Sequence, residues 1–137
     1  MGIILDTSAV IKAERTGVTA SAFLYNMSSL AGDQQVALSA IGYTELVHGL
    51  YRGDSDVRRQ RRRNFLAAIA VELQIYAYTQ EIAEIAGRID GEQTAKGNPI
   101  HFPDLLIGAT ALSLGFSVLT ANVRHFSLIP GLDVVPF

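Results

Sequence analysis

Three acidic residues stand where the surrounding sequence is otherwise apolar. Asp6 ends the apolar run 3–5, and Glu45 interrupts the apolar, helical-looking segment 40–51. Asp104 stands at the start of the most apolar helix-like stretch of the chain. Carboxylates bind hard divalent cations, orient water and accept protons, so these three residues are candidates for a shared chemical site.

Each acid also has a purely structural explanation. Asp6 could cap the helix that follows it, although Thr7 or Ser8 is also a good N-cap for a helix from Ala9. Asp104, in the first turn of its helix, would complement the helix dipole. Glu45 could lie on the solvated side of its helix. Taken singly, the three positions leave structural and catalytic roles open.

The elements that must position these acids alternate between strand and helix. Strands are predicted at 3–5, 36–39, 73–77, 116–120 and 134–135, with the last at an edge. Helices are predicted between them, including one capped by Thr19 that runs through 31, one over 40–51, a basic helix opened by the turn Gly53-Asp54-Ser55, one capped by Thr79 and one over 104–114. A turn is predicted over 122–126. This alternation is typical of parallel βαβ units. We expect a three-layer α/β/α sandwich with a central, mostly parallel sheet, forming a single domain over residues 1–137.

A parallel sheet would bring the acids together, because its strands end at one common edge. Asp6 and Asn122 follow strands, and Asp104 begins a helix that leads into a strand. Two carboxylates ~5 Å apart at an effective dielectric of ~20 repel by roughly 3 kcal/mol. A convergent site therefore favours a bound cation. Oxygen ligands in a chain without cysteine favour Mg²⁺ or Mn²⁺ over zinc.

The composition and charge of the chain argue against several classes of protein. The net charge of −2 argues against a broad basic surface that coats nucleic acid. The absence of cysteine excludes a disulfide scaffold and fits a reducing cytoplasm. Asp6 interrupts the apolar start, so no signal peptide is expected. The uncharged segment 105–123 contains four hydroxyl residues and a central glycine, which favours a buried helix and strand over a membrane span.

Four segments resemble the PIN-domain nucleases. They are Ile-Leu-Asp-Thr-Ser at 4–8, Tyr-Thr-Glu-Leu-Val-His-Gly at 43–49, Pro-Asp-Leu-Leu-Ile-Gly-Ala-Thr-Ala-Leu at 103–112 and Leu-Thr-Ala-Asn-Val-Arg-His-Phe at 119–126. The chain length and the Ile-Pro-Gly-Leu near its end resemble VapC toxins of bacterial toxin–antitoxin pairs. The resemblance covers essentially the whole chain, with the four segments in the expected order.

The resemblance implies a Mg²⁺- or Mn²⁺-dependent endoribonuclease that cuts structured RNA such as tRNA or rRNA. Asp6, Glu45 and Asp104 match the acidic positions of the family and would hold the cation and carry catalysis. Thr7 or Ser8 would bond to Asp6 or to the scissile phosphate. Asn122 stands where the family often has a fourth acid and would position water. The resemblance also implies products with 5′-phosphate ends, a homodimer and a VapB-like antitoxin as partner.

Other polar residues have two interpretations. Six of the eleven basic residues lie between Arg52 and Arg63. Arg58, Arg59 and Arg62 are candidate RNA-backbone contacts, or else part of a solvated helix face. His48 and His125 are candidate ligands or acid–base groups, and His101 is expected in a loop. Four aromatic and Met side chains of the first half are expected mostly in the core: Tyr25, Met27, Tyr43 and Tyr51.

Two further classes share the strand that ends in aspartate. A haloacid-dehalogenase-like phosphatase needs a second acid where this chain has Ser8, and a receiver domain needs paired acids near its first strand. The main alternative is a PIN-like module that binds RNA or a partner without cutting it, because Asn122 replaces an acid. RNA incubated with the protein and Mg²⁺ or Mn²⁺, with EDTA as control, separates that module from a nuclease.

Overall fold

The computed structural model describes residues 1–53 and 55–137, and Asp54, in the predicted turn before the basic helix, lies outside them. The described residues form a five-stranded sheet in the order β3-β2-β1-β4-β5. All neighbouring strands run parallel, as the sequence predicts. The strands are β1 (Gly2–Leu5), β2 (Gln35–Ser39), β3 (Gln74–Tyr76), β4 (Ser117–Thr120) and β5 (Val134–Pro136).

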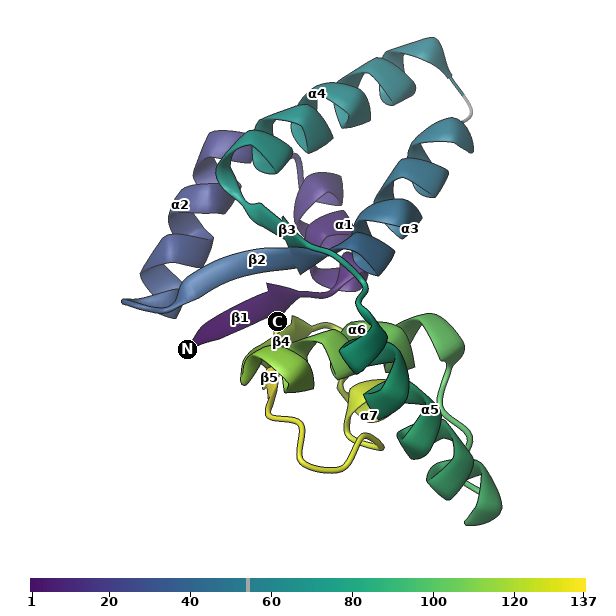
Figure 1. Ribbon diagram of the computed structural model, residues 1–137. Coiled ribbons are helices and arrows are strands. Elements are labelled where there is room, and N and C mark those ends of the chain that lie inside the picture. The colour runs from purple at the N-terminus through teal and green to yellow at the C-terminus, as the bar shows by residue number, and fades with distance from the viewer. Residues whose placement is uncertain (54) are drawn as a thin grey trace.

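Helices cover both faces of this sheet and complete the predicted three-layer α/β/α sandwich (Figure 1). One layer contains α1 (Thr7–Arg15), α2 (Ala20–Ala31), α3 (Ala40–Tyr51) and α4 (Asp56–Glu72). The other contains α5 (Gln80–Ala95), α6 (Phe102–Leu114) and the short α7 (Val123–Phe126).

Strand β1 lies between two hydrophobic cores, one on each face of the sheet, and contributes side chains to both. Side chains alternate across a strand, so Ile3 and Leu5 pack into the core beneath α1–α4, whereas Ile4 packs into the core beneath α5–α7. None of the three is more than 4% exposed. The apolar run that precedes Asp6 is therefore buried on both faces, as expected for the middle of a parallel sheet.

The junction between β1 and α1 differs from the prediction. Helix α1 begins at Thr7, two residues earlier than expected, and Asp6 occupies the N-cap position. The Asp6 side chain makes no capping hydrogen bond, so helix capping does not explain this acid. Hydroxyl caps do occur elsewhere, where Thr19 and Thr79 accept backbone hydrogen bonds at the starts of α2 and α5.

Two predictions at the periphery were wrong. Residues 122–126 were predicted as a turn, but α7 forms there because the side chain of Phe126 is fully buried and holds the segment against the core. Tyr25 and Tyr51 were expected mostly in the core, but they are 73% and 70% exposed. Helical spacing alone does not show which apolar residues face a neighbouring element.

The uncharged segment 105–123 forms most of α6 and all of β4, as predicted. Within the described part of the chain, no helix combines the length and apolar character that crossing a membrane requires.

Gly108 lets α6 approach the loop before β5 closely. A Cβ atom at this position would lie 2.3 Å from Cδ1 of Ile129, inside van der Waals contact. We expect Gly108→Ala to destabilise the protein by about 1–3 kcal/mol, the usual cost of overpacking. Urea unfolding measures this change.

The matched control is Gly87→Ala, in a helix position where an added Cβ meets nothing within 4 Å. Alanine there should leave stability unchanged or raise it by about 0.5–1 kcal/mol, because it restricts the unfolded chain. Equal midpoints for Gly108→Ala and the parent would contradict the close approach.

Candidate active site

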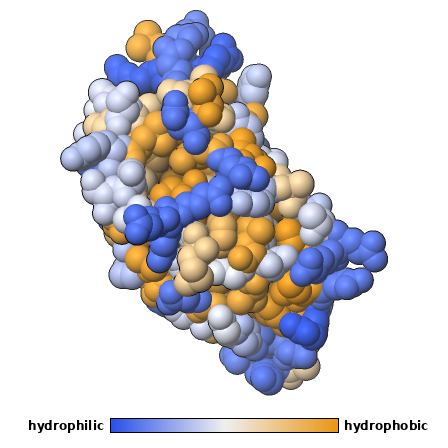
Figure 2. All heavy atoms as spheres, turned by 60° about the vertical axis from the view of Figure 1, so that its left-hand side comes forward, coloured by the Kyte–Doolittle hydropathy of each residue, from blue (hydrophilic) through white to orange (hydrophobic). Residues whose placement is uncertain are grey.

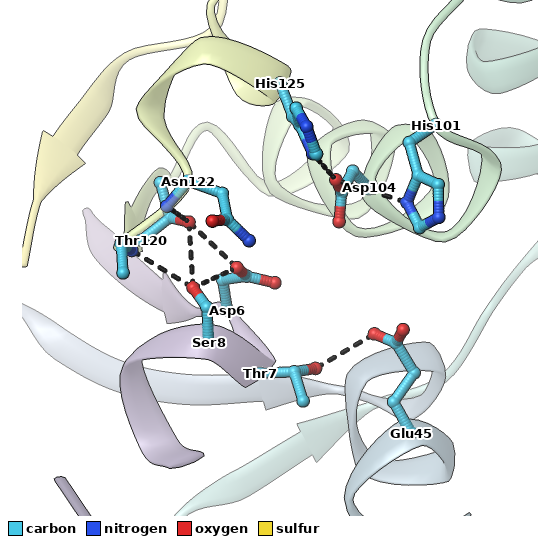
Figure 3. Close-up of polar contacts among 10 residues, drawn as sticks. Asp6, Thr7, Ser8, Glu45, His101, Asp104, Thr120, Asn122 and His125 are labelled. Atoms are coloured by element: carbon cyan, nitrogen blue, oxygen red, sulfur yellow. Dashed lines mark hydrogen bonds and ion pairs between the residues drawn. The ribbon is translucent and has the colours of Figure 1, made fainter. Parts of the chain in front are cut away.

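Asp6 is a buried carboxylate at the carboxyl end of the central strand. Its residue surface is 2% exposed. The hydroxyl groups of Ser8 and Thr120 both donate hydrogen bonds to its Oδ2 atom, at 2.6 and 2.8 Å. These bonds fix the rotamer of the carboxylate, and they leave its other oxygen directed into the space in front of the sheet edge (Figure 3).

Thr120 is a site residue that the sequence reasoning missed. The pairing of Leu5 with Leu119 across β1 and β4 places Thr120 beside Asp6, and Thr120 is fully buried. Its hydroxyl also accepts a hydrogen bond from the backbone N–H of Asn122 at 2.9 Å. The signal available in the sequence was a threonine at the end of a predicted strand. Its hydroxyl can reach an aspartate that ends the neighbouring strand.

Glu45 reaches the same region from α3. The hydroxyl of Thr7 donates a hydrogen bond to Glu45 Oε1 at 2.9 Å, which joins the first residue of α1 to the middle of α3. Ser39 positions this helix, because its hydroxyl caps the first turn through a 2.9 Å bond from Gly42 N. Thr7 and Ser8 therefore have distinct partners: Ser8 holds Asp6 and Thr7 holds Glu45.

Asp104 is held by two histidines. It lies in the first turn of α6 and is 6% exposed. Nδ1 of His125 lies 2.8 Å and Nδ1 of His101 lies 3.3 Å from the same atom, Asp104 Oδ2. His101 lies in the loop that leads into α6, as expected, at the N-cap position of that helix, but its contact with Asp104 was not predicted.

The three acids face one another although they are far apart in the sequence (Figure 3). Burial raises the pKa of Asp6 and that of Glu45 above the ordinary carboxyl range. The hydrogen bonds from Ser8 and Thr120 to Asp6, and from Thr7 to Glu45, partly offset this rise. The negative charge of Asp104 adds to the raised pKa of both residues, so all three acids share one electrostatic environment.

This donor set suits a hard divalent cation. Side chains engage one oxygen of each carboxylate, namely Asp6 Oδ2, Glu45 Oε1 and Asp104 Oδ2. The second oxygens of Asp6 and Asp104 point into the shared space (Figure 3). The side chain of Asn122 points toward Asp6 from the side of α7. Carboxylate and amide oxygens with no thiolate are ligands for Mg²⁺ or Mn²⁺.

The raised pKa values predict how stability depends on pH without a cation. A carboxyl whose pKa is higher in the folded state binds a proton more tightly there, so folding is favoured at low pH. In EDTA, the contribution of Asp6 and Glu45 to stability should fall as pH rises through the carboxyl range toward their raised pKa values. Beyond those values it should stay constant.

Comparison with Asp6→Asn/Glu45→Gln isolates this effect. Urea unfolding in EDTA should show that the variant gains stability relative to the parent as pH rises from acid to neutral. Identical pH profiles for the two proteins would contradict the raised pKa values. Added Mg²⁺ should reduce the difference at neutral pH by stabilising the parent, because ligands that bind the folded state stabilise it.

The structure does not bring the basic helix to the acids. Arg59 pairs with Asp56, and Arg62 contacts Glu14 Oε2 at 3.4 Å and Gly49 O at 3.3 Å. Together with Arg58, they line a groove between the end of α1, the end of α3 and α4, which includes none of the three acids. His48 is exposed and has no hydrogen bond or ion pair among the described residues.

Sequence comparisons place this chain among known proteins. Residues 3–132 match the family model described as PIN domain. Ribonuclease VapC1 from Rickettsia felis is 31% identical over 135 residues, covering 98% of this chain and 96% of that protein. The tRNA(fMet)-specific endonuclease VapC from Salmonella typhimurium is 28% identical over 73% of this chain and 74% of its own length.

A structural comparison supports the fold. The chain is similar to a chain in the crystal structure of VapBC2 from Rickettsia felis bound to a DNA fragment from the promoter, with a TM-score of 0.87. The match covers 100% of this chain and 99% of the other at 23% identity.

Proposed function

The chain belongs to the PIN-domain family and is a VapC-type ribonuclease, and from this premise we propose that it cuts structured RNA with a divalent cation held by Asp6, Glu45 and Asp104. The observation that carries the proposal is the arrangement of these carboxylates, which come from β1, α3 and α6 and face one space (Figure 3). The relative named as a tRNA(fMet)-specific endonuclease supports tRNA as the first substrate to test.

Each acid has a distinct part in the proposed reaction. When bound, Mg²⁺ or Mn²⁺ would polarise the scissile phosphate and acidify water. Asp6 and Asp104 are fixed by their neighbours and present one oxygen each to the shared space. Glu45 is held through Oε1 by Thr7, so its other oxygen orients the attacking water and accepts a proton from it. Asn122 positions water opposite Asp6.

The products follow from in-line attack. The water oxygen bonds to phosphorus while the bond between phosphorus and the 3′ oxygen breaks. Glu45 takes one proton from the water, and the leaving 3′ oxygen receives one from solvent. This leaves a 5′-phosphate on one fragment and a 3′-hydroxyl on the other.

An RNA digest tests the proposal. The purified protein is incubated with a tRNA pool and with rRNA in Mg²⁺ or Mn²⁺, with EDTA in a parallel reaction, and the 5′-phosphate ends are sequenced. Cleavage at few positions that stops in EDTA is expected. RNA binding without cleavage under all conditions would instead support the non-cleaving module. Cleavage that persists in EDTA would contradict the metal requirement.

The antitoxin partner is proposed to occupy the groove beneath the basic helix. This groove has a volume of about 1020 Å³. It combines apolar residues such as Val18, Leu50 and Phe65 with basic residues on its border: Arg15, Arg52, Arg58, Arg59, Arg61 and Arg62. Figure 2 shows an apolar hollow crossed by hydrophilic side chains in the half of the molecule that contains α2, α3 and α4. An acidic peptide with apolar anchors complements such a surface.

Charge reversal tests this placement. Arg15→Glu/Arg61→Glu should weaken binding of the cognate VapB-like antitoxin by at least about tenfold, because each reversal replaces attraction with repulsion. Arg88→Glu on α5, outside the residues that line the groove, is the matched control and should bind normally. Equal affinities would place the antitoxin elsewhere. Weaker RNA binding with a flatter salt dependence would instead favour an RNA track.

The remaining partner and domain proposals are a homodimer and a single domain over residues 1–137. Analytical ultracentrifugation of the free protein tests the first, with a sedimenting mass of two chains expected. Limited proteolysis that yields one protected fragment of nearly full length would support the second.

A further inference from the structure

Two imidazoles and a carboxylate gather at the junction of α6 and α7. Nδ1 of His101 and Nδ1 of His125 approach the same oxygen of Asp104, at 3.3 and 2.8 Å. One ligand-type atom from each of the three residues lies within 4.8 Å of the others. The three acids Asp6, Glu45 and Asp104 form what we call the hard-cation pocket, which offers carboxylate oxygens. The cluster at α6 and α7 differs from it because it offers two nitrogen donors and one oxygen donor.

The backbone fixes this cluster from two directions. His101 and Asp104 are three residues apart at the start of α6, so their side chains lie on one face of the helix. His125 comes from α7, which Phe126 ties to the core with a fully buried side chain. The two imidazole centroids are 5.9 Å apart, with Asp104 between the rings (Figure 3).

We propose that His101, Asp104 and His125 form a binding site for Zn²⁺, distinct from the hard-cation pocket but sharing Asp104 with it. Imidazole nitrogens favour Zn²⁺ and other late first-row cations over Mg²⁺, which prefers oxygen. Three protein ligands with an open fourth position are typical of zinc sites that keep a water molecule.

The geometry needs only small side-chain movements to accept the ion. Ligands at ~2.1 Å from a tetrahedral zinc ion lie about 3.4 Å from one another. The present separations of 2.8 and 3.3 Å from Asp104 Oδ2 are close to that spacing. The side chains of His101 and His125 are 58% and 53% exposed, so both rings can turn and solvent can reach the fourth position.

Asp104 can serve both sites because its oxygens face different ways. Oδ2 meets the histidines, whereas the other oxygen points toward the space between Asp6 and Glu45 (Figure 3). The proposed zinc site can be tested separately from the ribonuclease function, because its two imidazole ligands are not among the three acids of the proposed hard-cation pocket. Asp6 and Glu45 belong to that pocket and not to the zinc site.

Zinc titration calorimetry and Co²⁺ absorption test the proposal on the full chain. The parent should bind one equivalent of Zn²⁺, and Co²⁺ in its place should give the intense visible bands of a tetrahedral site. Loss of an outer-shell partner alone weakens metal sites about 10–100-fold. His101→Ala and His125→Ala, which remove direct ligands, should therefore each lower zinc affinity by at least about 100-fold and abolish the cobalt bands.

Two further variants locate the ion. His48→Ala removes an exposed histidine outside the cluster and should bind zinc normally. Asp6→Asn/Glu45→Gln disables the hard-cation pocket and should also retain the zinc equivalent and the cobalt bands. This separates failure of the zinc proposal from failure of the ribonuclease proposal.

Two results would overturn the proposal. One is unchanged zinc affinity in His101→Ala and His125→Ala, with their folds verified by circular dichroism. The other is loss of zinc binding in Asp6→Asn/Glu45→Gln with zinc binding retained in the histidine variants. That result would place the ion in the hard-cation pocket. In either case the imidazoles would serve only to hold the Asp104 carboxylate.

Discussion

Replacing Asp6 with asparagine is expected to lower the rate of RNA cleavage by roughly a thousandfold or more. A divalent cation contributes several kcal/mol to stabilising the transition state of phosphoryl transfer. Since each 1.36 kcal/mol changes a rate tenfold, losing one charged ligand from the pocket removes most of the activity. Initial rates on a labelled tRNA substrate in Mg²⁺, for parent and variant at equal concentration, measure the effect.

The folded structure should survive this substitution. The amide oxygen of asparagine can replace Asp6 Oδ2 and accept the same two hydrogen bonds, from Ser8 and Thr120. Burial raises the pKa of the native carboxyl, so the neutral amide should be at least as stable in EDTA. Asp33→Asn, at an exposed turn residue, is the matched control and should cleave RNA normally. Full activity in Asp6→Asn would remove the basis for the proposed site.

Replacing Phe126 with alanine is expected to cost about 3–5 kcal/mol of stability, the usual range for a buried phenylalanine. Phe126 is fully buried in the core between the sheet and α5–α7. A loss of this size is a large part of the ~5–15 kcal/mol that stabilises a typical domain. Urea unfolding at neutral pH measures the change in the free energy of unfolding.

Phe126→Ala should also affect the position of Asp104, because Phe126 holds α7 against the core. Phe126 adjoins His125, which contacts Asp104 Oδ2 at 2.8 Å, so a loosened α7 should also weaken the hold on Asp104. Phe102→Ala is the matched control, because Phe102 is 60% exposed. Its stability should stay within about 0.5 kcal/mol of the parent, as for most surface substitutions. A comparable loss in both variants would contradict the anchoring role of Phe126.

Local sequence patterns were sufficient to predict the α/β architecture. The run 3–5 is apolar at every position because β1 is covered on both faces, and that pattern can be seen without coordinates. Hydroxyl caps at Thr19 and Thr79 were equally visible, since capping depends on residues within one turn. The start of α1 was placed two residues late, because several neighbouring side chains could have capped it.

Local sequence patterns predicted only part of the candidate active site. Asp6, Glu45 and Asp104 were identified because an acid is out of place in an apolar segment. Their hydrogen-bond partners carry no such signal, because serine, threonine and histidine are ordinary at surfaces and helix ends. Thr120 was missed although its place at the end of a predicted strand was an available signal, whereas His101 became visible as a site residue only through its contact with Asp104.

The amino-acid sequence by itself determined the order of strands and helices, the buried central strand and the three out-of-place acids, because these follow from periodicity and residue type over short stretches. Only the tertiary structure decided that Ser8 holds Asp6 while Thr7 holds Glu45, that two histidines converge on Asp104, and that the arginines of α4 line a separate groove. Most of these arrangements depend on strand register and helix packing between residues far apart in the sequence, such as Thr7 and Glu45, which are 38 positions apart, and local pattern does not encode such contacts.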